Sequence, residues 1–319
     1  MFDFRYHALS LAAVLLALAV GVVIGVAIGD SNLVSSAKSG IVHDLSSEVQ
    51  GAQSQAEQAR TKLASEEAFV NDLYPIAVHG LLNGRSIGLV FLGGASNQVD
   101  GFVRDAITEA GGDLATVVAV REPLDVNGLA HAAEGTRFAA LAGEPPLPSS
   151  APTTGGARAA EGAGSEADAK LLESFGAILG RQLVSGAQNV DRELISRVRA
   201  RLLTAFDGQL GKLDALVVVR NEPRVLTPAQ STDAARLESG LLEGAAAVGI
   251  PVVGAELSSS APSQIPWFQS RTLSSVDDID TTAGQAALVY ALTGSHGSYG
   301  TKPTADSLLP NVVGASSQP

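Results

Sequence analysis

The chain has 319 residues, of which 45% are hydrophobic and only 4% aromatic, and its 21 basic and 33 acidic residues give a formal net charge of −12. This balance argues against a nucleic-acid-binding surface, so no nucleic-acid partner is expected, and against a polybasic patch that docks on anionic lipid. The absence of cysteine excludes disulfides, thiolate metal sites and cysteine nucleophiles.

The first element along the chain, residues 8–29, contains no charged side chain and predicts a transmembrane helix behind a short flank, 1–7. At about 1.5 Å per residue it reaches about 33 Å, which is enough for a hydrocarbon core of roughly 30 Å. Small residues recur at every fourth position, so a second helix can approach closely. This predicted helix–helix interface comprises Ala13, Ala17, Gly21, Gly25 and Gly29.

A cleaved signal peptide is the alternative interpretation of this N-terminus, because the small residues Ala27 and Gly29 precede Asp30 at the spacing of a cleavage site. The apolar region of a signal peptide is only about 7–15 residues long, so the longer run favours an uncleaved signal anchor. Arg5 precedes the span, and the positive-inside rule then favours a cytoplasmic N-terminus. We expect a single-pass protein in contact with membrane lipid, with the bulk of the chain extracytoplasmic, in the cell envelope.

The next segment, 30–78, has apolar residues spaced alternately three and four apart, which is typical of a coiled coil. These positions are Val42, Leu45, Val49, Ala52, Ala56, Ala59, Leu63, Glu66, Val70, Leu73 and Ala77, and ten of the eleven are apolar because only Glu66 interrupts the series. The alanines bury little area, so pairing is expected to depend on an anchor that already associates and raises the effective concentration. We expect a homo-oligomer. The alternative is one long amphipathic helix folded back on the following domain.

Residues 80–295 alternate strand and helix signals and predict an α/β domain. Short apolar runs predict strands at 87–92, 116–120, 215–219, 250–253 and 271–276. Helical patterns predict helices at 99–107, 169–184, 190–206, 229–248 and 282–292. The strands are continuously apolar rather than alternating, which suits a parallel, Rossmann-like sheet covered by helices on both faces.

Two further segments are loop-like in composition. Residues 144–168 are rich in Pro, Gly, Ser and Ala and predict a disordered insertion in a surface loop of the α/β domain. Residues 296–319 predict a loop-like C-terminal tail.

The densest acidic group, Asp277, Asp278 and Asp280, follows a predicted strand and precedes a predicted helix. Clustered carboxylates could bind a hard cation, but capping of the helix N-terminus, shared with Thr281, is the favoured interpretation. His296 lies in a glycine-rich loop that could present metal ligands, although a structured turn is the simpler interpretation. These three aspartates and His296 are the candidate metal ligands, and the identity of the metal is left open.

The run Gly93-Gly94-Ala95-Ser96 stands between a predicted strand and a predicted helix, where phosphate loops lie in nucleotide-binding folds. The full G-x-G-x-x-G pattern is missing and no G-K-[ST] follows, so a tight turn is favoured over a nucleotide site. The G-x-S-x-G motif of α/β-hydrolases is also missing. No catalytic residue and no cofactor-binding residue are therefore predicted, and an enzyme is not expected.

Three stretches together resemble one known family: Phe4-Arg5-Tyr6-His7 leading into the apolar span, Ser275-Val276-Asp277-Asp278-Ile279-Asp280, and the glycine-rich run 294–300. They are similar to the actinobacterial copper transporter family typified by mycobacterial copper transport protein B. The resemblance spans the whole chain. It implies a cell-envelope protein that limits copper accumulation through copper efflux or copper tolerance, described for the family as an outer-membrane channel. A bound copper ion is implied by this resemblance only.

The residues alone support a second hypothesis. In this interpretation the protein is a non-enzymatic envelope scaffold that dimerises through its anchor and coiled coil and binds an envelope protein partner through its α/β domain. A third hypothesis is a degenerate nucleotide- or sugar-binding domain.

Overall fold

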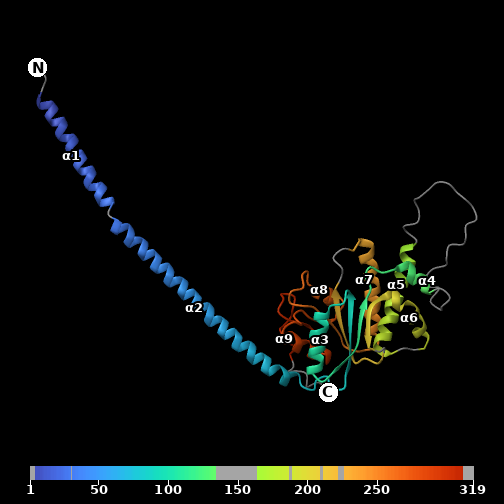
Figure 1. Ribbon diagram of the computed structural model, residues 1–319. Coiled ribbons are helices and arrows are strands. Elements are labelled where there is room, and N and C mark those ends of the chain that lie inside the picture. Colours follow the sequence, from blue (N-terminus) through green and yellow to red (C-terminus); the bar gives the residue numbers. More distant parts are fainter. Residues whose placement is uncertain are drawn as a thin grey trace, which may run out of the picture. The chain divides into compact units, whose positions relative to one another are not determined.

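A computed structural model describes residues 4–29, 31–133, 164–186, 189–208, 211–221 and 226–311 (Figure 1). The chain divides into two compact units, Met1–Ala68 and Phe69–Pro319. The first unit contains helix α1 (Phe4–Ile28) and most of helix α2 (Ser31–Val78). The second contains the end of α2 and the α/β domain.

Helix α2 runs without interruption through all of the heptad positions, so the predicted helix is confirmed. The apolar side chains of Leu45, Val49 and Leu63 on this helix are exposed. Pairing of two such helices as a coiled coil stays a prediction.

The second unit is built on one seven-stranded sheet with the order β3-β2-β1-β4-β5-β6-β7. The strands are β1 (Ser86–Gly93), β2 (Asp113–Val120), β3 (Leu203–Gly208), β4 (Ala215–Asn221), β5 (Val252–Ala255), β6 (Ser274–Val276) and β7 (Ser298–Tyr299). All neighbouring strands are parallel except β2 and β3. The predicted mixed α/β class is confirmed, and the order around β1 is that of a doubly wound sheet.

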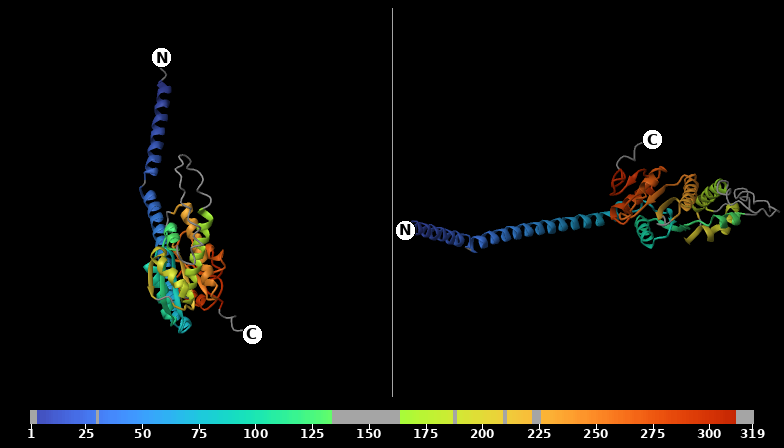
Figure 2. Two further views of the ribbon diagram at one scale, coloured as in Figure 1. Left: turned by 90° about the vertical axis from the view of Figure 1, so that its right-hand side faces the viewer. Right: turned by 90° about the horizontal axis from the view of Figure 1, so that it is seen from above.

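Helices cover both faces of this sheet, as the views in Figures 1 and 2 show. The helices of the domain are α3 (Asn97–Glu109), α4 (Val126–Ala133), α5 (Gly164–Ser185), α6 (Asn189–Leu202), α7 (Pro228–Ala246), α8 (Ile265–Gln269) and α9 (Thr282–Leu292). Successive residues of β1 point to opposite faces. Leu89 and Phe91 join the core under α3 and α9, whereas Val90 and Leu92 join the core under α5 and α7.

Helices α5 and α7 touch backbone to backbone through four glycines. Gly176 and Gly180 lie on α5, and Gly240 and Gly244 lie on α7, each pair four residues apart. A Cβ atom added at any of these positions would come within 3.0 Å of a backbone oxygen of the facing helix. The spacing that predicted close helix approach in the membrane span therefore operates in the α/β domain as well.

Several sequence expectations are corrected. The helix predicted at 190–206 ends at Leu202, and Leu203–Gly208 forms β3, which pairs antiparallel with β2 at the edge of the sheet. The strand predicted at 271–276 begins only at Ser274, because Thr272 adopts a left-handed conformation with φ of 56°. The short helices α4 and α8 have no counterpart in the predicted elements.

The two loop-like segments also differ in part from expectation. Residues 144–163 of the predicted insertion lie outside the described residues, while 164–168 begin helix α5. The predicted tail contributes β7, a strand of two residues that is too short to leave a periodic pattern. Its last residues, 312–319, lie outside the described residues.

Candidate functional site

The carboxyl ends of the parallel strands meet at one edge of the sheet, which is where doubly wound domains bind ligands. The glycine turn follows β1, Asn221 ends β4, Glu256 follows β5 and Asp277 follows β6. This edge therefore contains most of the polar residues that the sequence singles out as candidate ligands.

The glycine turn after β1 is tied to the end of β4. Gly94 N–H donates to the carbonyl of Asn221 at 3.3 Å, and the Asn221 side-chain amide donates to the carbonyl of Gly94 at 2.8 Å. Gly93 has a φ of 98°, and a Cβ atom there would collide with Asn221. Ser96 caps α3 by accepting from Val99 N–H at 3.4 Å. The glycines thus serve the close approach of two strand ends, which supports the turn interpretation over a phosphate site.

The three clustered aspartates have different surroundings, and two of them accept hydrogen bonds from neighbouring loops. Asp277 accepts backbone N–H bonds from Thr301 at 2.8 Å and from Lys302 at 3.0 Å, which attaches the C-terminal segment to β6. Asp280 accepts from the backbone N–H and the hydroxyl of Ser258, at 2.7 and 2.6 Å. Burial acts to raise the pKa of Asp280, but the bonds from Ser258 outweigh it, and this pKa lies below its usual value.

Among these residues, only Thr281 caps the N-terminus of helix α9. Its hydroxyl accepts from Gly284 N–H at 2.9 Å, as the sequence predicts. The expectation that the aspartates share this cap is wrong, because the carboxylates of Asp277 and Asp280 bind other loops and that of Asp278 is buried beside them.

Asp278 is fully buried, and neither of its carboxylate oxygens has a hydrogen-bond partner among the described residues. Burial raises the pKa of Asp278 to about 6, and the negative charge of Asp277 adds to the increase, while the nearby hydroxyls of Thr281 and Thr301 oppose it. A buried carboxyl with this pKa is protonated in mildly acidic solution and carries an uncompensated charge at neutral pH.

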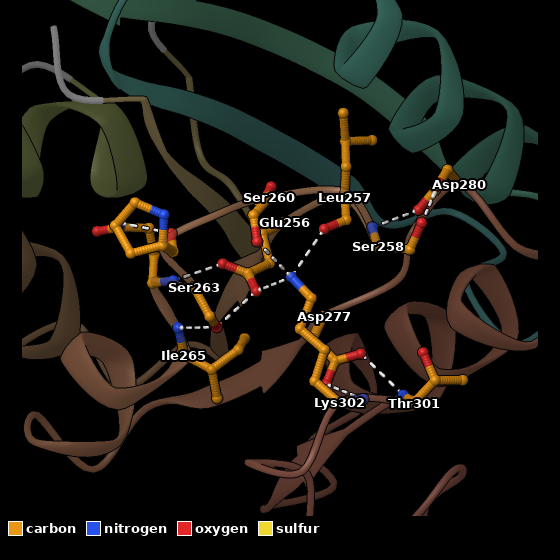
Figure 3. Close-up of polar contacts among 12 residues, drawn as sticks. Glu256, Leu257, Ser258, Ser260, Ser263, Ile265, Asp277, Asp280, Thr301 and Lys302 are labelled. Carbon is orange, nitrogen blue, oxygen red and sulfur yellow. Dashed lines mark hydrogen bonds and ion pairs between the residues drawn. The ribbon is translucent and has the colours of Figure 1, made fainter. Parts of the chain in front are cut away.

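A buried ion pair connects the end of β5 to the C-terminal segment (Figure 3). The Lys302 ammonium contacts the Glu256 carboxylate and donates to the carbonyls of Leu257 at 3.0 Å and Ser260 at 3.1 Å. Glu256 also accepts from the Ser263 hydroxyl at 2.7 Å and from Gln264 N–H at 2.6 Å. All three donor positions of the ammonium are therefore occupied, which indicates a structural clamp rather than a reactive lysine.

His296 lies away from the aspartates. Ser298 pairs with Ser275 and Tyr299 with Val276, so His296 precedes the amino-terminal end of this ladder whereas Asp277 follows its carboxyl end. The separation along the sheet is about four residues, or about 13 Å. His296 instead lines a hollow of about 130 Å³ with Thr272 and Leu273.

The four candidate metal residues are thus not brought together. Across the part of the chain that the structure describes, no group of three or more His, Asp or Glu residues is arranged to hold a metal ion. Two of the three aspartates, Asp277 and Asp280, accept backbone N–H bonds and so attach neighbouring loops to this edge of the sheet.

A second polar cluster, which the sequence patterns do not predict, lies around the end of β4. Arg220 forms a buried ion pair with Glu238 of α7 at 3.2 Å and donates to the side chain of Gln264 at 2.7 Å. The guanidinium of Arg271 lies 3.8 Å from the ring centre of Trp267, the one tryptophan of the chain. Burial lowers the pKa of Arg271. An arginine at the end of an apolar strand is the signal that could have indicated this cluster.

The contribution of Asp278 to the stability of the α/β domain is expected to fall as pH rises through the titration of this carboxyl. The pKa of Asp278 is raised in the folded state. This carboxyl therefore costs the folded domain nothing below its pKa in the unfolded chain, about 3.8, and lowers the free energy of unfolding by about 2–3 kcal/mol by pH 7. We expect Asp278→Asn to remove this loss, with urea unfolding followed between pH 4.5 and 7.5. Parallel pH profiles for the two proteins would contradict the prediction.

The described membrane element is α1, in which Tyr6–Ala27 is long and apolar enough to cross a membrane. The positions of the predicted interface are exposed, and Gly21 and Gly25 have open space where a side chain would be. The surface of small residues is therefore available for a second helix.

The model of the family described as copper transport outer membrane protein, MctB, matches residues 1–310. The chain belongs to this family. Curated MctB relatives named copper transporters come from Mycobacterium tuberculosis and Mycobacterium bovis, and each is 28% identical over 94% of this chain and 96% of its own length. The MctB description names transport and a membrane, which agrees with the apolar helix α1, and it names no enzymatic reaction.

Proposed function

We propose that the protein acts in copper efflux as a membrane-anchored component of the cell envelope and so limits copper accumulation. The observation that carries this proposal is the family match over residues 1–310, which includes the membrane helix and the α/β domain alike. The relatives named copper transporters align over 94% of the chain, so the similarity is not confined to a common fold element.

In this proposal α1 stays attached as a signal anchor, with a cytoplasmic N-terminus and the α/β domain outside the cytoplasm. Arg5 before the span supports this orientation through the positive-inside rule. Copper is the cargo.

The protein is proposed to act in an assembly. One spanning helix encloses no pore, and the open faces of Gly21 and Gly25 favour tight pairing with a second helix. The soft ligands that select Cu(I) are scarce, because the chain has no cysteine and one methionine. Copper selectivity would then come from residues that several chains or a partner protein contribute together.

Cell-associated copper tests this proposal. After growth in added copper, we expect more copper in a strain that lacks the protein than in its parent, and a return to the parental level on complementation. Cell-associated zinc, measured in the same samples, is the control and is expected to stay unchanged. Equal copper in the deletion and complemented strains would contradict the proposal.

A second candidate function is an envelope scaffold that binds a partner protein through the α/β domain. The observation that favours it is the run of exposed apolar side chains along α2, which supports the dimerisation that this scaffold requires. Crosslinking in whole cells would distinguish the two, because a scaffold gives a specific heterologous adduct whether or not copper accumulates in the deletion strain.

A further inference from the structure

The end of helix α2 has an apolar surface that its own domain leaves uncovered. The side chains of Phe69, Leu73 and Ile76 are 66%, 46% and 74% exposed. They are spaced four and three residues apart and therefore lie on one face of the helix. We call these three residues the distal stripe.

The α/β domain binds the opposite face of the same helix. Val78 is buried in the core under α9, and its position is about half a turn around the helix from Phe69. The hydroxyl of Tyr290 donates to the carbonyl of Ala77 at 2.9 Å, and the hydroxyl of Thr282 donates to the side chain of Asn71 at 2.6 Å. Because these contacts fix the helix with the distal stripe outward, this part of α2 does not fold back to bury it.

The distal stripe continues the heptad series and adds apolar side chains along one flank of it. Leu73 belongs to the series, whereas Phe69 and Ile76 occupy the g positions that flank it. Farther from the domain, the middle of the series consists of Ala52, Ala56 and Ala59, which bury little area, and the larger Leu45 and Val49 precede them. The gain from pairing at the domain-proximal end of α2 therefore exceeds the gain along the alanine segment.

The charges at the flanking e and g positions fit a second copy in parallel register, whereas Glu66 within the series would meet its own copy, and Lys62, 3.8 Å away on the same helix, only partly offsets its charge. In a parallel pair, the g position of one helix faces the following e position of the other. Lys62 is at g and Glu67 is at the following e, so opposite charges meet across the pair. The earlier pairs, Glu48 with Gln53 and Gln55 with Arg60, bring no like charges together.

We propose that the distal stripe is the main contact between two copies of this chain, joined in parallel and in register along α2. The proposal rests on the self-association that the proposed function assumes, and it names the residues that produce it. Anchors in one membrane place both helices in the same direction and raise their effective concentration. The alanine segment then acts as a spacer.

Disulfide formation in native membranes tests the register, and the chain without cysteine gives a clean background. Glu66→Cys lies at a heptad position that meets its own copy in a parallel pair, and Ala68→Cys lies on the far side of the helix. We expect an interchain disulfide for Glu66→Cys in the full chain, and at least roughly fivefold less for Ala68→Cys. Equal yields, or no disulfide for Glu66→Cys, would overturn the register.

A second set of variants tests the stripe. In the Glu66→Cys chain, Phe69→Ser with Ile76→Ser is expected to reduce association by at least roughly tenfold, because both side chains lose their apolar contact. Ala52→Ser with Ala59→Ser is the matched control and is expected to change it by less than about threefold. Both replaced residues of the stripe are exposed, so the domain is expected to keep its unfolding curve. An unchanged disulfide yield in the stripe variant would overturn the proposal.

The outcome of the disulfide experiments can be separated from the outcome of the copper measurement. If the deletion strain shows normal copper but the disulfide pattern holds, the copper proposal fails and the stripe stands. If copper accumulates in the deletion strain but the stripe variant crosslinks normally, the stripe proposal fails alone. An adduct between Glu66→Cys and a different protein in place of the homodimer would assign the surface to another partner and overturn the second copy.

Discussion

Gly240→Ala is expected to destabilise the α/β domain by about 2–4 kcal/mol, although alanine is the better helix former. The added methyl group would collide with the backbone of Glu173 on α5. It can be accommodated only if α5 and α7 separate, which loosens the contacts of Gly176 and Gly244 as well. Urea unfolding of the full chain in detergent, followed by Trp267 fluorescence, measures the effect.

Gly101→Ala is the matched control. Gly101 also lies within a helix, α3, but a Cβ atom there meets nothing within 4 Å. This substitution is expected to stabilise the domain by about 0.5–1 kcal/mol, because alanine lowers the entropy of the unfolded chain. A change in the free energy of unfolding with the same sign for both variants would show that the close α5–α7 contact does not limit stability.

Lys302→Met is expected to destabilise the domain by about 3–5 kcal/mol. The Glu256 carboxylate is 3% exposed and would lose the ammonium that compensates it. The loss also releases the C-terminal segment from the carbonyls of Leu257 and Ser260. Urea unfolding at pH 7 measures it.

Two controls separate charge from packing. Adding Glu256→Gln to Lys302→Met removes the uncompensated charge and is expected to restore part of the stability. Arg104→Met breaks the exposed pair with Asp100 and is expected to cost less than about 0.5 kcal/mol. A loss for Lys302→Met as small as that for Arg104→Met would contradict the buried clamp.

The elements that the sequence predicts correctly are those with long, regular signals. Strand β1 is a continuous apolar run before a glycine turn, and Ser96 marks the start of α3. Strand β3 is different, because an antiparallel edge strand depends on its neighbour β2 and its residues continue the helical pattern of α6. The need for glycine at positions 176 and 240 arises only when two helices far apart in sequence meet, because a Cβ atom there would collide with the facing backbone.

The candidate site was less predictable than the fold. The sequence groups Asp277, Asp278 and Asp280, but their partners come from distant loops that no local pattern connects to them. Lys302 lies in a segment of loop-like composition, and its role depends on the position of Glu256 at the end of β5. The capping residue Thr281 was predictable because a cap is a local interaction.

The most direct test of the central claim extends the copper measurement to its time course. Cells of the deletion and complemented strains are loaded with copper, washed, and followed for loss of cell-associated copper, with zinc-loaded cells in parallel. Efflux predicts slower copper loss in the deletion strain, reversed by the full chain, with zinc loss unchanged. Equal rates of copper loss in the two strains would contradict a role of this protein in copper efflux.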